Sequence, residues 1–315
     1  MARLVLGRVA SGVLTIFLLS LLIFLGTEIL PGDVATALLG QSGSQETLEA
    51  IRQSLGLHDP PPLRYWHWLS SFLSGDLGLS LANRTPIGPE LWARTQSTFL
   101  LAGLAAVITV PVSLALGIAT AVWRNSIFDR VVNILGLAAI SLPEFFIAYL
   151  LILVFAVDMN LFPSLSAPTD DMSVGAHLWS IALPALTLML AVLGYIMRMT
   201  RTAILSVLSL PYIEMAILKG VPPWRIVLFH ALPNALAPII QVTAYNLAYM
   251  VVGVVLVEVV FVYPGVGQYL VDAVSKRDVP VVQDCGMVFG ATYVGLNAFA
   301  DILVILVNPR LRHSL

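Results

Sequence analysis

The chain has 315 residues, of which 58% are hydrophobic and 11% are charged, and its formal net charge at pH 7 is −2. A soluble domain carries about 25% charged residues, so this composition excludes a soluble protein and indicates an integral membrane protein. The small net charge provides no basic surface for nucleic acid. The single cysteine, Cys285, excludes an intramolecular disulfide and a cysteine-rich metal site.

Six apolar segments are long enough to cross a membrane, which takes about 20 mainly apolar residues. The expected spans are Val9–Thr27, Thr95–Trp123, Val131–Val157, Met172–Met197, Ala235–Val257 and Cys285–Val307. Only two of them contain an acidic residue, Glu144 in the third and Asp301 in the sixth. The sequence therefore predicts an all-α integral membrane protein with six transmembrane helices.

The spans divide the chain into four parts. These are an N-terminal anchor helix (1–31), an extracytoplasmic segment (32–94), a five-helix core (95–307) and a tail (308–315). The first span is expected to stay uncleaved, because no small-x-small cleavage site follows it. No internal repeat is visible, which is unlike the inverted-repeat design of many secondary transporters.

The outer segment carries two local patterns. Leu48, Ile51 and Leu55 recur at helical spacing and predict a short amphipathic helix. The aromatic residues between Tyr65 and Phe72 predict an anchor at the membrane interface.

Orientation follows from the basic residues, which favour the cytoplasmic side. One side of the predicted spans holds ten of the sixteen, namely Arg3, Arg8, Arg124, Arg130, Arg198, Arg201, Lys219, Arg225, Arg310 and Arg312. We therefore expect that side, and both termini, to be cytoplasmic.

A polar island, Tyr212–Asn234, separates the fourth and fifth spans on this side. Pro211 suits the first turn of a helix, and Gly220 lies where a helix commonly ends. Val221-Pro222-Pro223 then predicts a turn, because neither proline can continue a helix. A second short helix, Trp224–Phe229, is expected to lead into the fifth span.

This island resembles the EAA loop of ABC-importer permeases. The matching residues are Glu214-Met215-Ala216, three residues, Gly220, nine residues and His230-Ala231-Leu232-Pro233. Met215 stands where the family pattern has alanine. Further segments resemble the dipeptide, oligopeptide and nickel branch: Leu30–Asp33, Gly75–Ser80, Ser141–Pro143, Val257–Phe261, Tyr263–Gly267, Leu270–Ala273 and Arg277–Gln283.

The resemblance implies a type I ABC-importer permease in the bacterial inner membrane. It implies three kinds of partner: a homologous second permease, two cytoplasmic P-loop ATPase subunits and an extracytoplasmic substrate-binding protein. The cargo is expected to be a di- or oligopeptide, with chelated nickel, opines or glutathione as alternatives. It also implies that the loop couples to the ATPases through Glu214, Met215, Ala216, Gly220, Leu232 and Pro233.

The chain itself contains no G-x-x-x-x-G-K-[ST] phosphate loop. We therefore expect no enzymatic activity and no cofactor in this chain, with ATP and Mg²⁺ bound by the partner ATPases. The five histidines show no paired metal-ligand spacing, so no metal site is predicted.

Two features are candidates for a translocation path. Glu144 lies in the third span, where a charge costs about 3 kcal/mol or more, so it lines a pore or instead bonds to backbone groups near an interface. In the fifth span, Gln241, Tyr245 and Tyr249 recur every four residues with Asn246 adjacent. This polar stripe lines a pore or forms hydrogen bonds between helices. Asp301 is expected to be structural and to meet either a basic residue or backbone groups.

Two rival classes remain. Gly40-Gln41-Ser42-Gly43 matches the GxSG pattern of rhomboid intramembrane proteases, although Ser42 precedes a polar outer helix rather than a buried one. A secondary transporter or channel is the other rival, but neither needs an EAA-like loop.

Overall fold

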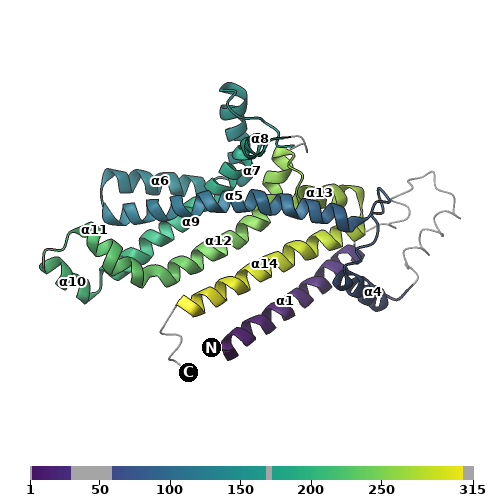
Figure 1. The fold of residues 1–315 in the computed structure, drawn as a ribbon, viewed down its shortest axis with the longest axis horizontal. Coiled ribbons are helices and arrows are strands. Elements are labelled where there is room, and N and C mark those ends of the chain that lie inside the picture. Colours follow the sequence, from purple (N-terminus) through teal and green to yellow (C-terminus); the bar gives the residue numbers. More distant parts are fainter. Residues whose placement is uncertain (1, 30–58, 168–171, 308–315) are drawn as a thin grey trace.

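The computed structural model describes residues 2–29, 59–167 and 172–307, and within them the chain is built almost entirely of helices (Figure 1). Five stretches in this part are long and apolar enough to cross a membrane, and a bent pair of helices makes a sixth if it counts as one span. The main spanning helices are α1 (Ala2–Ile29), α5 (Ile87–Val122), α9 (Ala182–Leu208), α12 (Leu232–Phe261) and α14 (Val279–Val307). The predicted all-α membrane fold is confirmed.

The third span differs from the uninterrupted helix expected over Val131–Val157. Helix α6 (Ile127–Ser141) ends before Pro143, and α7 (Glu144–Leu151) leaves at 108° to continue into the π-helical segment η2 (Ile152–Asp158). Leu142 between them is extended, at φ −89° and ψ 137°, because a proline disfavours helical geometry in the residue before it. In Figure 1, α7 accordingly points away from the long axis of the bundle.

The fourth span lies further along the chain than the expected Met172–Met197. A short helix, α8 (Val174–Ser180), comes first, and α9 then continues through Arg198 and Arg201. The Arg201 guanidinium donates from Nε and Nη2 to the two carboxylate oxygens of Asp129 on α6, both at 2.8 Å. Because this ion pair compensates the charge, a search for charge-free segments ends the helix too early.

Helix α9 is the centre of the bundle. A buried apolar cluster joins it to α5, α7 and α12, and includes Leu101, Ala105, Ala148, Leu188, Val192, Met250 and Val254. Small residues bring the helices close together: a Cβ atom at Gly194 would collide with the Gly136 carbonyl of α6. Close backbone approach at small residues is how helices pack in a membrane, where lipid removes the hydrophobic driving force.

Helices α1 and α14 lie side by side along one edge of the bundle (Figure 1). Helix α4 (Pro61–Ser74) folds against the end of α1, where Tyr65 Oη lies 2.8 Å from Ser20 Oγ and the Tyr65 ring packs on Phe24. Within the predicted aromatic anchor, Tyr65 is therefore buried, whereas Trp66 is 62% exposed. The predicted helix around Leu48–Leu55 lies outside the described residues.

One difference concerns the start of the second span. Helix α5 begins at Ile87, before the expected start at Thr95. With 36 residues it is about 54 Å long, well beyond the hydrocarbon core of a bilayer of about 30 Å. The helix is therefore longer than one crossing of the membrane requires.

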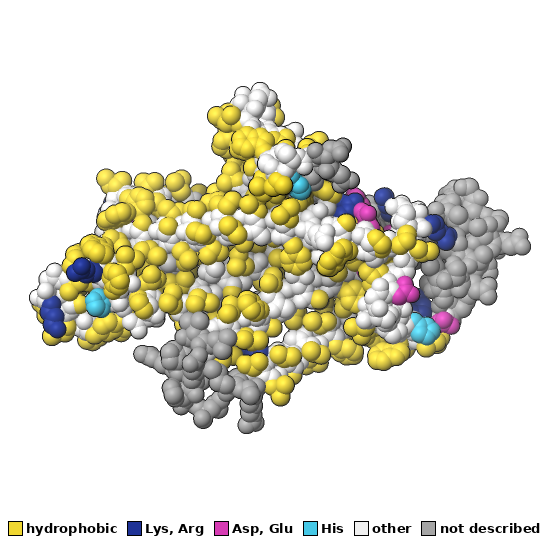
Figure 2. Space-filling view, viewed as in Figure 1, with side chains coloured by type: hydrophobic (Ala, Val, Ile, Leu, Met, Phe, Trp, Pro, Cys, Tyr) yellow, Lys and Arg dark blue, Asp and Glu magenta, His cyan; other side chains and the backbone are white. Residues whose placement is uncertain are grey.

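The molecule has two polar ends. Helices α10 (Pro211–Leu218) and α11 (Pro223–Arg225) lie at one end, and α4 and α13 (Val266–Lys276) lie at the other (Figure 1). Figure 2 shows a mostly hydrophobic surface between the ends and charged side chains gathered at them. This distribution is that of a membrane protein seen from the side.

Candidate functional site

Helix α10 is a short helix that exposes apolar side chains. Leu210 is extended and Pro211 starts the helix, while Gly220 ends it at φ +75° and donates its N–H to the Ile217 carbonyl at 2.9 Å. Ile213 is fully buried and anchors the helix to the bundle. On the other face Leu218 is 81% exposed, and Met215 and Ile217 are also exposed. A face of this kind, outside the long helices, is suited to contact another protein.

The segment from α10 to the start of α12, Pro211–Asn234, is called the hairpin below. It contains all the predicted coupling residues, which differ in their exposure. Glu214, Met215, Gly220 and Pro233 are exposed, whereas Ala216 and Leu232 are half-buried. Leu232 packs on the buried cluster below, and Pro233 lies in the first turn of α12 without interrupting the helical path from Pro223 to Phe261. The predicted short helix Trp224–Phe229 is therefore not separate: α11 and the π-helical segment η3 (Ile226–Ala231) run directly into α12.

A polar joint holds α10 to the start of α12. Asn234 Nδ2 donates to Tyr212 Oη at 3.1 Å and to the His230 carbonyl at 2.8 Å. The Tyr212 hydroxyl also donates to the His230 carbonyl, at 3.3 Å. Sequence reasoning did not assign a role to Tyr212 or Asn234, although they are the first and last residues of the polar island.

Segment η3 connects the hairpin to the bundle. Val227 and Ala231 are buried against Ala121 of α5 and against Ala203 and Ile204 of α9. A displacement of α10 can therefore reach α12 through the polar joint of Tyr212 with His230 and Asn234, and can reach α5 and α9 through the packing of η3.

In the middle of the bundle the structure brings two predicted residues together. Glu144 is the first residue of α7, and its Oε1 accepts a hydrogen bond from Tyr249 Oη of α12 at 3.2 Å. The other oxygen, Oε2, is buried and has no hydrogen-bond partner among the described residues. The carboxylate thus lies at a helix N-terminus, which favours negative charge, and bonds to a side chain rather than to the backbone.

The residues of the predicted polar stripe on α12 differ in their exposure. Gln241, Tyr245 and Tyr249 are exposed on one face of α12, whereas Asn246 is half-buried and donates to the Val242 carbonyl of its own helix at 2.8 Å. Tyr245 Oη donates to Asp301 of α14 at 3.2 Å, and Asp301 also pairs with Arg8 of α1 at 3.1 Å. Of the two expected partners of Asp301, a basic residue or backbone groups, the structure shows the basic residue, Arg8.

At the other end, a buried carboxylate fixes the start of α13. Glu258, near the end of α12, accepts hydrogen bonds from Thr98 Oγ1 of α5 at 2.6 Å and from the backbone N–H of Gly267 at 2.7 Å and Gln268 at 3.2 Å. A Cβ atom at Gly265 would collide with this carboxylate. Glu258 and Gly265 lie in segments that carry the sequence resemblance, but the contact was not foreseen, because it also involves Thr98 of α5, which is 160 positions from Glu258.

Bundled spanning helices, a protruding helical hairpin at one end and a polar stripe between the ends define the class of membrane permease subunits. The chain belongs to the family of binding-protein-dependent transport system inner membrane components: the family model matches residues 113–313, and the model of its N-terminal part matches residues 1–88. It is therefore a multi-pass inner-membrane protein and a permease subunit.

Relatives match over their full length. Proteins of Brucella abortus strain 2308 and Brucella melitensis, named as peptide transport system permease proteins, are each 37% identical over 315 residues, covering 100% of both chains. The glutathione transport system permease protein of Escherichia coli strain K12 is 36% identical, again over 100% of both chains. With this family established, neither the protease nor the stand-alone channel interpretation has support, and Ser42 of the protease motif lies outside the described residues.

Proposed function

We propose that this chain is one of two pore-forming subunits of an ATP-driven importer of short peptides. Two cytoplasmic ATPase subunits bind ATP and Mg²⁺ and drive the cycle, and an extracytoplasmic binding protein delivers the peptide. The end that carries α10 faces the cytoplasm, and both termini lie on that side.

The exposed apolar face of α10 is the observation that carries this proposal. Leu218 and Met215 are exposed on α10, which lies at one end of the molecule (Figure 1). Exposed apolar surface in water marks a protein contact. Since Tyr212 of α10 is hydrogen-bonded to Asn234 in the first turn of α12, a partner that moves α10 would move a spanning helix with it.

The stripe on α12 supports the pore. Polar groups facing hydrocarbon lose hydrogen bonds to water, so Gln241, Tyr245 and Tyr249 are better placed against an aqueous path shared with a second permease. Glu144 and Tyr249 would line the same path, since they are hydrogen-bonded to each other.

The cargo class rests on the relatives, whose names specify peptides or glutathione, itself a tripeptide. Within the predicted alternatives, a peptide is therefore favoured over nickel chelates and opines.

Uptake by intact cells tests the proposal. Cells lacking the gene are compared with cells complemented by the wild type or by a chain in which Leu218→Asp places a charge on the exposed face of α10. We expect accumulation of labelled trialanine only with the wild type, with equal amounts of both chains in the membrane. Equal uptake in all three strains would contradict the peptide-import function.

A further inference from the structure

A cavity of about 500 Å³ lies at the end of the molecule that carries α13. Its walls are the loop 80–86, the first two turns of α5 and one face of α13, all beyond the apolar part of the spans. Ligand sites commonly have volumes of about 300 to 1,000 Å³. The cavity is therefore large enough for a small molecule.

Hydrogen bonds to a buried carboxylate hold the wall of the cavity in place. Asp278, 3% exposed, accepts hydrogen bonds from Ser80 Oγ and from the backbone N–H groups of Leu81 at 3.0 Å and Ala82 at 3.3 Å. These bonds fix the loop 80–86 against the turn between α13 and α14. Tyr269 is half-buried, and burial raises its pKa to about 12, so its phenol stays neutral at physiological pH.

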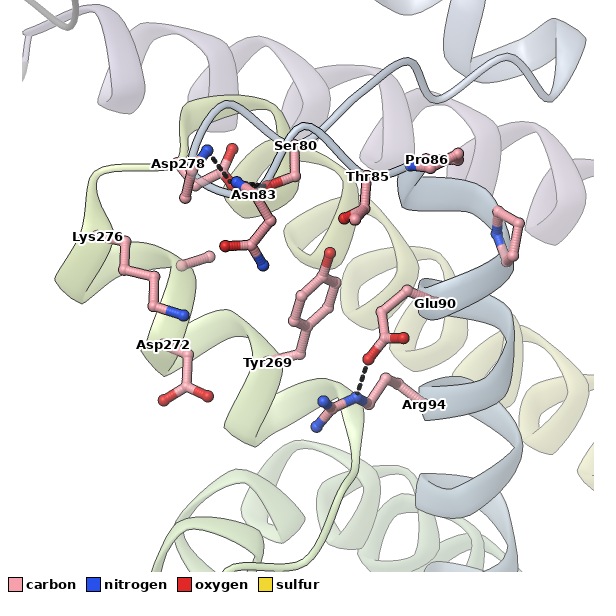
Figure 3. Close-up of a pocket in the computed structure, with 13 residues that line it drawn as sticks. Ser80, Asn83, Thr85, Pro86, Glu90, Arg94, Tyr269, Asp272, Lys276 and Asp278 are labelled. Atoms are coloured by element: carbon pink, nitrogen blue, oxygen red, sulfur yellow. Dashed lines mark hydrogen bonds and ion pairs between the residues drawn. The ribbon is translucent and has the colours of Figure 1, made fainter. Parts of the chain in front are cut away.

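The lining carries charges of both signs. Glu90 and Arg94 form an ion pair at 2.7 Å, and the Arg94 guanidinium lies over the Tyr269 ring, 5.4 Å from its centre. Asp272 and Lys276, one turn apart on α13, also line the cavity, and neither has a salt bridge to another described residue. Figure 3 shows Lys276 and Asn83 on one side of the Tyr269 ring, and Glu90 and Arg94 on the other.

This lining matches the chemistry of a free short peptide, which carries an ammonium group, a carboxylate and amides between them. Residues four apart lie on the same face of a helix, so Asp272 and Lys276 present one anion and one cation on the face of α13 that lines the cavity. The Asn83 side-chain amide and the Thr85 hydroxyl can donate and accept hydrogen bonds with peptide amides.

We propose that this outer cavity binds the two charged ends of a short peptide, with Asp272 holding the ammonium group and Lys276 the carboxylate. The inference rests on the proposed peptide import and adds a subsite on the permease itself. A peptide released at the outer face would be held there beside α13, whose start Glu258 fixes to the pore helix α12.

Binding of end-capped peptides tests the cavity. The full chain, purified from native membranes with its associated subunits into nanodiscs but without binding protein, is titrated with trialanine, N-acetyl-trialanine and trialanine amide. Charge-assisted hydrogen bonds contribute about 1.5–3 kcal/mol, so free trialanine should bind at least about tenfold more tightly than either capped form.

Two variants should separate the two ends. Asp272→Asn should remove the preference for a free amine and leave the affinity for N-acetyl-trialanine unchanged. Lys276→Gln should remove the preference for a free carboxylate and leave the affinity for trialanine amide unchanged. Arg84→Gln, which removes a cation from the same loop but not from the lining, is the matched control and should preserve both preferences.

Equal binding of all three peptides, no saturable binding, or the same loss in both variants for every peptide would overturn the proposal. So would variants that lose only the association with an extracytoplasmic protein, because the charges would then serve protein docking. If wild-type cells import trialanine while the cavity shows no preference, the import function stands and only the subsite falls. If wild-type cells import no peptide, the proposed function itself falls.

Discussion

At the scale of single residues, Gly220 shows what the turn after α10 requires of its sequence. Its backbone lies at φ +75°, and nothing lies within 4 Å of a Cβ atom built there. The position therefore needs glycine for its backbone conformation and not for space. Left-handed geometry costs most residues about 1–2 kcal/mol, and least for glycine and asparagine.

Two substitutions at Gly220 separate conformation from bulk. Gly220→Val should distort the end of α10 and reduce peptide uptake at least about tenfold, since a β-branched residue is strongly disfavoured there. Gly220→Asn, similar in volume but tolerant of positive φ, should keep most of the uptake. Uptake of labelled trialanine by complemented cells measures both, and equal loss in the two variants would show that bulk at this position is what matters.

Gly265 is needed for the opposite reason, because the Glu258 carboxylate fills the space beside it. Gly265→Ala must displace Glu258 from Thr98 and from the backbone of α13, which should destabilise the protein by about 1–3 kcal/mol. Thermal unfolding in detergent measures this as a lower midpoint. Gly103→Ala on α5, where nothing lies within 4 Å, is the control and should leave the midpoint unchanged or raise it; equal midpoints for both variants would contradict the account.

At the scale of elements, the Asp129–Arg201 pair joins α6 to α9. Asp129 is 3% exposed and bonds to both guanidinium donors, so Asp129→Asn leaves Arg201 with an unpaired charge that is only partly in water. We expect a loss of about 1–3 kcal/mol. The double variant Asp129→Leu/Arg201→Met should recover part of it, because apolar replacement of a buried pair is often neutral.

Thermal unfolding of the single and double variants measures this coupling. A double variant that is less stable than Asp129→Asn would contradict this prediction. It would show that losing the ion pair costs more stability than leaving Arg201 unpaired.

The same pair shows where sequence reasoning succeeded and failed. Uninterrupted apolar runs located the spanning helices, and Pro211 and Gly220 located α10, because these signals are local. The length of α9 was misjudged because Arg201 is compensated by a residue 72 positions away. The bend after Ser141 could have been expected from Pro143, but its 108° angle depends on how α7 packs on α9 and α12.

The predicted site residues also differ in whether a local sequence signal or tertiary packing determines their place. The stripe of Gln241, Tyr245 and Tyr249 shares one exposed face, as the four-residue spacing indicates. The partners of its tyrosines, Glu144 and Asp301, lie on other helices, and their pairing depends on tertiary packing. The outer cavity was not predicted, because the loop 80–86, α5 and α13 come together only in the folded chain.

At the scale of the whole molecule, the chain has two polar ends that are joined by its spanning helices. At one end α10 is bonded to the start of α12 through Tyr212 and Asn234, and the helix then runs from Pro223 to Phe261 and carries the buried Glu258, which holds α13 at the other end. Force applied by a partner at α10 would therefore pass through this polar joint to a long helix and along it to the opposite end. The proposed coupling requires that an ATPase binds α10.

Photo-crosslinking in native membranes tests whether an ATPase contacts α10. A photoreactive phenylalanine analogue replaces Leu218, which is 81% exposed on α10, or Leu22, which is 66% exposed on α1 and serves as the lipid-facing control. We predict that the Leu218 position forms an adduct with a chain containing a G-x-x-x-x-G-K-[ST] phosphate loop and that the Leu22 position does not. Adducts with no such chain at Leu218, when both variants are present in the membrane in equal amounts, would contradict the account.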